Sequence, residues 1–221
     1  MRKTAVILFI IINILPLAIL GIYLYENIGG AENVNEVVKN SPFKEFVYID
    51  HKTLMILKDS GNIQNVPEIL KESLIFINGI YIGDHGSVGI KMPLGFLVKY
   101  IPIENFEYYN GVLITNPSES DFGKAEINDL ISTIPQDYKD VIIYKQDYAI
   151  GIYYDLKTNK THVVYVFKKS DYSEINTEML EDKLLQETNA VSCEVINMGD
   201  KVCVYLEFNG INLDLMNNGI S

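Results

Sequence analysis

An uninterrupted apolar run near the N-terminus is the clearest hydrophobic pattern in the chain. From Ala5 to Tyr25 no residue carries a charge, and a helix of this length is roughly 30 Å long, about the thickness of the hydrocarbon core of a bilayer. Arg2 and Lys3 precede the run, whereas the opposite flank begins with Glu26. Because basic residues favour the cytoplasmic side, the pattern predicts one transmembrane helix with a cytoplasmic N-terminus.

A cleaved signal peptide is the alternative interpretation of this run. Signal peptides have an apolar region of about 7 to 15 residues, followed by a small-x-small cleavage site. Here the apolar run is longer, and the small residues at 29–31 do not form such a site. We therefore predict a retained signal anchor over residues 1–27, with Leu20 inside its apolar stretch. A linker over residues 28–41 then leads to a domain outside the cytoplasm.

After the linker, the pattern becomes typical of β-strands. Apolar-rich runs flank Asn-Gly pairs that begin at Asn78, Asn110 and Asn209. An Asn-Gly pair readily adopts positive φ at both positions, as a type I′ turn requires, so each pair predicts a β-hairpin. A further hairpin is predicted around residues 157–160. The sheet should therefore be mainly antiparallel.

Two segments show the helical period of apolar residues. The first covers residues 127–134, with Asp121 as its candidate N-cap. The second runs from about 176 to 187. It should bury three apolar side chains: Met179, Leu180 and Leu184. A shorter helix is predicted to begin near Asn65, where Pro67 and Glu68 suit a first helical turn.

These elements predict an α+β fold. We expect one N-terminal transmembrane helix, followed over residues 42–221 by a mainly antiparallel, β-rich extracytoplasmic domain with two or three helices packed on one face. The polar stretch at 116–121 is a candidate boundary between two subdomains, and a plain surface loop is the alternative.

The charge of the chain restricts its partners. The formal net charge is -11 over 221 residues, which argues against nucleic acid as a partner, since nucleic acid binding needs a basic surface. Arg2 is the only arginine. The predicted domain therefore has no guanidinium group for bidentate capture of phosphate or carboxylate.

Cys193 and Cys203 lie on the two arms of a hairpin predicted around residues 199–200. In the register that pairs them directly, an oxidising compartment would allow a disulfide. A slip of one residue would point the two side chains to opposite faces, and two free thiols packed as small hydrophobes are the alternative. With no histidine nearby, the two cysteines do not complete a metal site. No metal or other cofactor is predicted.

Asp84 and His85 are weak site candidates because they crowd together with Ser87 on a glycine-rich stretch. Catalytic triads bring side chains together from separate segments, and sequence neighbours on such a loop generally diverge. We therefore favour a polar turn here. His51 is also predicted to lie in a turn, and a structural role is favoured for His162 in a strand.

Two further surface features follow from the predicted hairpins. Asn159 begins the single N-x-S/T sequon with a non-proline middle residue, and its place in a turn makes it a candidate glycosylation site on an exported chain. Adjacent tyrosines at 108–109 and 153–154 would place one ring on each side of the sheet. Such rings suit a contact surface, although tyrosine is also a common strand residue.

No motif assigns a chemistry to this chain. The sequence lacks a P-loop, a dinucleotide fingerprint, a zinc-protease helix and a calcium-loop spacing, and no pair of carboxylates is evident as an acid and a base. We expect a membrane-anchored binding or assembly module that meets a protein or an envelope polymer, and we consider an enzyme less favoured. The alternative is an exported hydrolase whose site is built from scattered carboxylates and histidine.

Overall fold

The computed structural model divides into two compact units, Met1–Ala31 and Glu32–Ser221. Within the first unit a short helical stretch, residues 16–21, is described. All other described elements belong to the second unit. The described residues are 16–21, 33–60, 77–92, 106–115, 117–169 and 176–213.

The structure corrects the prediction of a membrane anchor. Of the run from Ala5 to Tyr25, residues 16–21 are described as helical and the remainder lies outside the described residues. A span needs about 20 helical apolar residues. Within the described ranges, no helix combines the length and the apolar character needed to cross a membrane. The predictions of a single-pass protein, of localisation at the cell membrane with an extracytoplasmic domain, and of the membrane as a partner are corrected accordingly.

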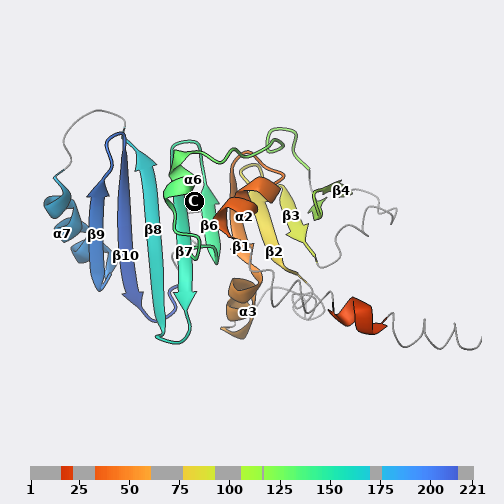
Figure 1. Cartoon of the computed structure of the whole chain (residues 1–221), viewed down its shortest axis with the longest axis horizontal. Coiled ribbons are helices and arrows are strands. Elements are labelled where there is room, and N and C mark those ends of the chain that lie inside the picture. Colours follow the sequence, from red (N-terminus) through yellow and green to blue (C-terminus); the bar gives the residue numbers. More distant parts are fainter. Residues whose placement is uncertain are drawn as a thin grey trace, which may run out of the picture. The chain divides into compact units, whose positions relative to one another are not determined.

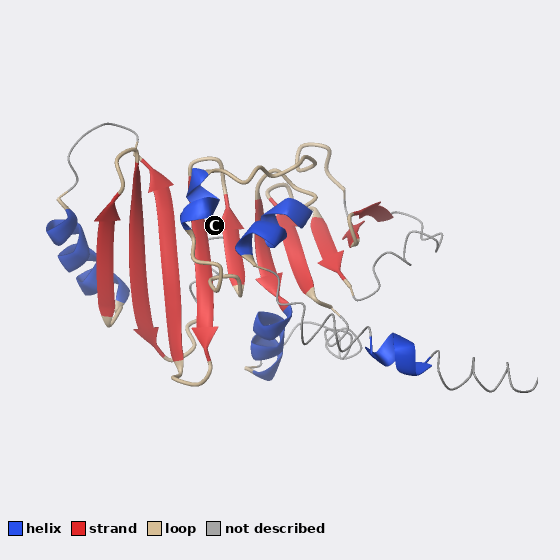
Figure 2. Cartoon of the chain, in the orientation of Figure 1, coloured by secondary structure: helices blue, strands red, loops and turns tan. Residues whose placement is uncertain are grey.

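The second unit is built around one sheet of ten strands, all antiparallel to their neighbours (Figures 1 and 2). The order across the sheet is β4-β5-β3-β2-β1-β6-β7-β8-β10-β9. The predicted antiparallel pairing is therefore confirmed. The strands are β1 Phe46–Asp50, β2 Gly79–Gly83, β3 Val88–Lys91, β4 Phe106–Tyr109, β5 Val112–Thr115, β6 Val141–Tyr144, β7 Tyr148–Asp155, β8 Lys160–Lys168, β9 Ser192–Asn197 and β10 Lys201–Asn209.

Of the three Asn-Gly pairs that are predicted to form hairpin turns, one does so. Asn110 and Gly111 have φ of 46° and 86° and join β4 to β5. The hairpin around residues 157–160 is also confirmed, because β7 and β8 pair along their length. In both hairpins the turn residues and the flanking apolar positions favour the same structure.

The other two Asn-Gly pairs do not close hairpins. Gly79 is the first residue of β2, where it pairs with both Asp50 and Lys91, and most of the predicted strand before Asn78 lies outside the described residues. At the third pair, Gly210 alone has positive φ, and residues 211–213 form no strand. Asn-Gly permits a type I′ turn but does not require one, since the tertiary pairing of the strands decides.

Helices cover both faces of the sheet, so the prediction of helices on one face is wrong. Buried residues of α2 and α6 pack against the face that carries Phe46 and Ile142, which we call face A. Leu54 of α3 packs on the opposite face, face B, as do Leu180 and Leu184 of α7. All four residues of β6 are buried, which shows that both faces are apolar and both need a cover. The helices are α2 Val34–Asn40, α3 His51–Asp59, α6 Asp129–Thr133 and α7 Thr177–Thr188.

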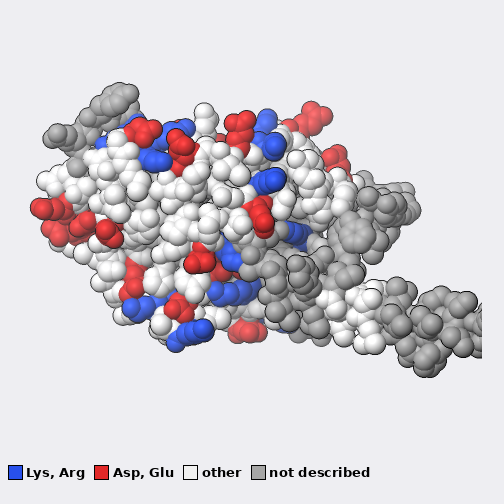
Figure 3. All heavy atoms as spheres, viewed as in Figure 1, with Lys and Arg blue, Asp and Glu red and all other residues white. Residues whose placement is uncertain are grey.

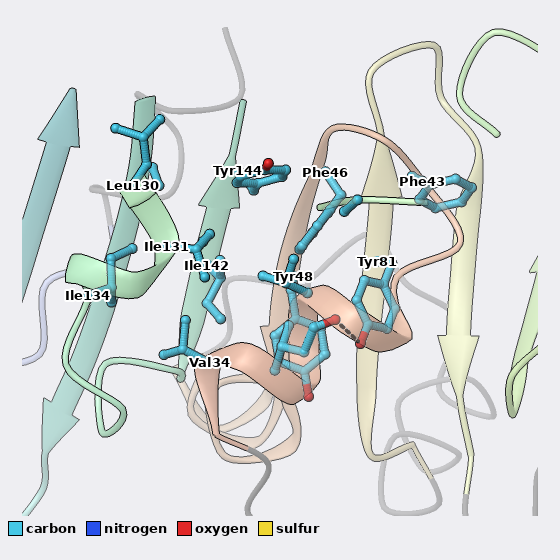
Figure 4. Packing of buried hydrophobic residues seen from close by; sticks show 14 of the residues in the cluster. Val34, Phe43, Phe46, Tyr48, Tyr81, Leu130, Ile131, Ile134, Ile142 and Tyr144 are labelled. Carbon is cyan, nitrogen blue, oxygen red and sulfur yellow. Dashed lines mark hydrogen bonds between the residues drawn. The ribbon is translucent and has the colours of Figure 1, made fainter. Parts of the chain in front are cut away.

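The segment predicted as a linker contributes to the core. Within residues 28–41, helix α2 buries Val34, Val37 and Val38 completely. Figure 4 shows Val34 of α2 and Leu130, Ile131 and Ile134 of α6 in one cluster with the aromatic side chains of face A. The Tyr81 hydroxyl donates to the Val37 carbonyl at 3.1 Å, which ties α2 to β2.

Two helix details differ from the predictions. Helix α6 begins after Asn128, whose Oδ1 accepts from the backbone N–H groups of Leu130 and Ile131, and not after Asp121. Helix α7 lies where predicted, but Met179 is 70% exposed. The helix predicted near Asn65 lies outside the described residues. Strands on both sides of residues 116–121 belong to the same sheet.

Candidate functional site

One line of polar side chains crosses face A at the end of the sheet where β1 and β7 finish. His162 of β8 pairs with both Tyr153 of β7 and Glu207 of β10. Asp140, directly before β6, accepts a backbone hydrogen bond from Asp50 N at 3.0 Å. Charged side chains of both signs gather at this end of the sheet in Figure 3. With one residue of α3, these residues make what we call the polar row: Asp50, Lys52, Asp140, Tyr153, His162 and Glu207.

Lys52 and Asp140 form an ion pair within the polar row, and its carboxylate is buried. The Lys52 Nζ lies 2.6 Å from Asp140 Oδ2, and the Asp140 side chain is 3% exposed. The same ammonium group donates to the Tyr154 carbonyl at 2.6 Å and lies 4.8 Å from the centroid of the Tyr153 ring. Tyr154 N also donates to Asp140 Oδ2, at 2.7 Å. These contacts fasten the first turn of α3 to β6 and β7.

Asp50 has a strongly shifted pKa beside this ion pair. Burial, followed by the nearby charge of Asp140, raises the pKa of Asp50 to about 7. The hydrogen bond from Thr53 N to Asp50 Oδ1, at 2.7 Å, opposes the shift and caps the N-terminus of α3. An uncharged or half-charged carboxyl therefore sits next to an ion-paired one at neutral pH.

The other half of the polar row combines aromatic rings with an ion pair. The rings of Tyr153 and His162 are stacked with centroids 5.8 Å apart, and Tyr138 lies 6.2 Å from Tyr153. Glu207 accepts from Lys160 Nζ at 2.6 Å and lies 3.6 Å from His162 Nδ1. Side-chain contacts therefore run from α3 through Tyr153 of β7 and His162 of β8 to Glu207 of β10.

Asp84 and His85 lie in an exposed turn between β2 and β3, and the structure gives them separate partners. His85 Nδ1 lies 2.8 Å from Asp121 Oδ1, while Asp84 pairs with Lys145. His85 is 61% exposed and the Asp121 side chain 1%. Burial alone would raise the pKa of Asp121, but hydrogen bonds from Ser87 and His85 outweigh it and lower that pKa. The arrangement clamps a turn and brings no nucleophile to His85 among the described residues.

Cys193 and Cys203 are free thiols on opposite faces of the sheet. The β9–β10 register pairs Cys203 with Ile196 and Cys193 with Leu206, so the two cysteines are offset by three positions. An odd offset points them to opposite faces. Cys203 is buried on face A, whereas Cys193 packs on face B near α7. The two sulfur atoms therefore cannot form the possible disulfide in this register.

Two further predictions concern residues of the β7–β8 hairpin. Asn159 has φ of 53° in the β7–β8 turn, and its glycosylation stays a prediction. Of the adjacent tyrosines, Tyr154 is fully buried on face B and Tyr153 belongs to the polar row on face A, as the strand alternation predicts.

The two edges of the sheet differ. At β9, the outward-facing N–H of Val195 donates to Glu181 Oε1 of α7 at 2.7 Å, so the helix satisfies this edge position. At β4, no other described strand pairs beyond the edge, and Phe106 and Tyr109 are 39% and 36% exposed. In a hairpin with a two-residue turn, the two residues that flank the turn are hydrogen-bonded to each other, here Tyr109 and Val112. The backbone N–H and C=O groups of Tyr109 and of Glu107 therefore point toward β5. The backbone groups of Phe106 and Tyr108 therefore point outward.

Sequence reasoning missed the partners that make these arrangements. Asp50 ends one short buried strand and Asp140 directly precedes another. An aspartate at the end of a buried strand is the sequence feature that could have indicated a buried polar contact. Asp121 was assigned to a helix cap, and nothing in its local sequence points to His85, 36 residues away.

Taken together, the fold and these contacts define an antiparallel β-sheet protein with helices on both faces and an edge strand, β4, that no other described strand pairs beyond. No family model and no solved structure matches the sequence. The chain is 68% identical, over 216 residues, to "Uncharacterized protein MJ0995" of Methanocaldococcus jannaschii. The match covers 98% of this chain and 95% of the relative. The chain therefore belongs to the family of MJ0995, whose description states no activity, ligand or partner.

Proposed function

We propose that this protein is a binding or assembly module that takes up an extended segment of a protein partner along the outer edge of β4. The supporting observation is the difference between the two edges of the sheet. Glu181 of α7 satisfies the edge N–H of Val195 on β9, whereas among the described residues β4 has no such cover. An open edge strand is a template for a further strand, and natural proteins usually protect it.

The side chains of β4 specify the chemistry of the partner. Phe106 and Tyr108 lie on one face of the strand, and Glu107 and Tyr109 on the other. Exposed aromatic rings provide large contacts at a low entropic cost. The carboxylate of Glu107 and the net charge of -11 favour a basic segment and oppose a second copy of the same chain.

A peptide-binding experiment tests this function. The probes are a fluorescent peptide that alternates lysine with valine and a matched peptide with glutamate in place of lysine, and the readout is fluorescence anisotropy at low salt. We expect the lysine peptide alone to bind. Tyr108→Pro removes an outward N–H and should weaken binding at least about tenfold, whereas Tyr108→Ala keeps that N–H and should weaken it less.

Two results would overturn the proposal. One is no binding of either peptide, and the other is equal binding by the wild type and by Tyr108→Pro. Thermal unfolding of each variant provides the control, because the proline lies at a position whose N–H does not bond to β5.

A hydrolase is the second candidate, and one observation favours it. Asp50, with its pKa raised to about 7, lies beside the ion-paired Asp140, so a proton donor and a carboxylate are neighbours. Chromogenic ester, phosphate and glycoside substrates test this candidate. Hydrolysis that is lost in Asp50→Asn but kept in Glu107→Gln would support it; no turnover of any substrate would remove its support.

A further inference from the structure

Part of face A has no helix over it among the described residues. On this face α6 packs on β7 and β8, whereas β10 has no helix in front of it in Figure 1. Tyr205 and Glu207 of β10 point to face A, because they alternate with Val204, which belongs to the apolar cluster on face B. Glu194 of β9 pairs directly with Tyr205 and lies on the same face. Tyr205 is half-buried and Glu194 is exposed, so an aromatic ring and a carboxylate meet solvent together.

A second aromatic ring, that of Tyr138, reaches this part of the face from the loop before β6. The Tyr138 carbonyl would lie 2.7 Å from a Cβ added at Gly151 of β7, so the glycine lets the loop pass directly over the sheet. The Tyr138 ring is half-buried, and its centroid lies 6.5 Å from that of His162 on β8. Tyr138 and Tyr205 both pack as partly buried residues against the core of face A. Two rings from separate segments therefore border the same stretch of β8 and β10.

Carboxylates act on both rings. Burial raises the pKa of Tyr205 to about 12, and the charge of Glu194 is among the further contributions. Burial, followed by the charge of Glu207, also raises the pKa of Tyr138. The Glu207 carboxylate is paired with Lys160, whereas Glu194 has no ion-pair partner among the described residues. A cation at these rings would therefore meet a carboxylate that no described lysine neutralises.

We propose that Tyr205, Tyr138 and Glu194 form a binding site for a small organic cation that carries an alkylated ammonium group. The face of a tyrosine ring attracts a cation, and Glu194 supplies the counter-charge. The protein already makes this kind of contact within itself, because Lys52 Nζ lies 4.8 Å from the centroid of the Tyr153 ring. No described lysine or arginine takes the corresponding place over Tyr205 or Tyr138. The net charge of -11 adds a long-range attraction for cations.

Two other classes of ligand fit this site less well. The described residues contain no group of three side chains that could hold a metal ion, and the rings offer a metal no strong ligand. An anion would face Glu194 and Glu207 without an arginine to bind it, since Arg2 is the only arginine in the chain. An alkylated ammonium group matches both the rings and the free carboxylate.

Choline and its uncharged analogue, in which a carbon atom replaces the nitrogen, test the proposal on the full chain. The two probes have the same size and shape and differ in charge. Saturation-transfer NMR at low salt measures the binding of each probe. We expect choline to bind and the uncharged analogue to bind at least about fivefold more weakly, because the analogue loses the attraction to the rings and to Glu194.

Matched variants locate the choline site. Tyr205→Leu removes the ring and should weaken choline binding at least about fivefold, whereas Tyr205→Phe keeps a ring and should bind choline as the wild type does. Glu194→Gln should also weaken binding. Glu187→Gln is the control, because Glu187 is an exposed carboxylate of α7, which packs on face B, and this variant should leave binding unchanged. Thermal unfolding shows that each variant is folded.

Three results would contradict the proposal. The first is no binding of choline to the folded wild type. The second is equal binding of choline and its uncharged analogue, which would indicate a site for neutral ligands. The third is unchanged choline binding in both Tyr205→Leu and Glu194→Gln. Neither the probes nor the variants involve β4, so failure here is distinguishable from failure of peptide binding at that edge.

Discussion

Asp50 and Asp121 are both carboxylates held inside the second unit, yet their pKa values move in opposite directions. Asp50 is buried next to another carboxylate, and its pKa rises from 3.8 to about 7. Asp121 accepts hydrogen bonds from His85 and Ser87, and its pKa falls. Burial and a neighbouring like charge dominate at Asp50, whereas hydrogen-bond donors dominate at Asp121, and the residue type alone does not reveal which applies.

The raised pKa of Asp50 makes its contribution to stability depend on pH. The folded state holds the proton more tightly than the unfolded state, so this contribution is present below about pH 4 and is lost as the pH rises through 7. Each pKa unit corresponds to about 1.4 kcal/mol. We expect Asp50→Asn, which keeps a helix cap, to flatten the decline in unfolding free energy between pH 4 and 8, measured by urea denaturation. An unchanged decline in the variant would contradict the assigned pKa.

Asp121 should show the opposite dependence. Its lowered pKa gives stability that is present above about pH 4 and is lost as the pH falls through the folded value. In Asp121→Asn the loss of thermal stability on acidification should be smaller than in the wild type. At neutral pH the variant should be less stable, because the amide replaces a charged acceptor of several hydrogen bonds. Melting curves at pH 3 and pH 7 measure both effects.

At the scale of elements, the Lys52–Asp140 ion pair links α3 to the sheet more firmly than the Lys160–Glu207 pair links β8 to β10. The side chains of Lys52 and Asp140 are 32% and 3% exposed, while those of Lys160 and Glu207 are 37% and 25% exposed, so the two pairs differ in the burial of the carboxylate. Removing one partner of a buried pair leaves an uncompensated charge, whereas removing one partner of a solvated pair costs little.

Matched substitutions test this difference. We expect Lys52→Met to lower the unfolding free energy by about 3 kcal/mol or more, and Lys160→Met, the control on the exposed pair, to lower it by less than about 1 kcal/mol. Urea denaturation at pH 7 measures both. Equal effects of the two variants would show that the Asp140 charge is not buried in solution.

The elements themselves were predictable to different degrees. The hairpins β4–β5 and β7–β8 and helix α7 were expected, because turn residues and apolar periodicity favour the same structure there. The turns at Asn78 and Asn209 were expected and did not form. The local sequence permits a turn at both places. However, β2 pairs with β1 and β3, and no strand follows β10 at residues 211–213.

At the scale of the whole molecule, one sheet carries strands from both sides of residues 116–121. Strands β1 and β6 pair at its centre, although Phe46 and its partner Tyr144 are 98 positions apart in the chain. This pairing joins strands from both sides of the candidate subdomain boundary in one sheet. We therefore expect the second unit to unfold in a single cooperative transition.

Hydrogen exchange measured by mass spectrometry against urea concentration tests this cooperativity. Peptides from β2 and from β8 should lose protection at the same midpoint. Two midpoints, one for each side of residues 116–121, would instead show two independently folding subdomains.

The sequence by itself determined the local features of this protein: strand alternation, antiparallel hairpins at the compatible turns, a helix at α7 and an acidic surface. These depend on neighbours within a few residues. The tertiary structure alone decided which face each helix covers, the register that separates Cys193 from Cys203, the pairing of Asp121 with His85 and of Lys52 with Asp140, and the difference between the two sheet edges. Such contacts join residues far apart in the chain, and their free energy depends on burial that no local pattern records.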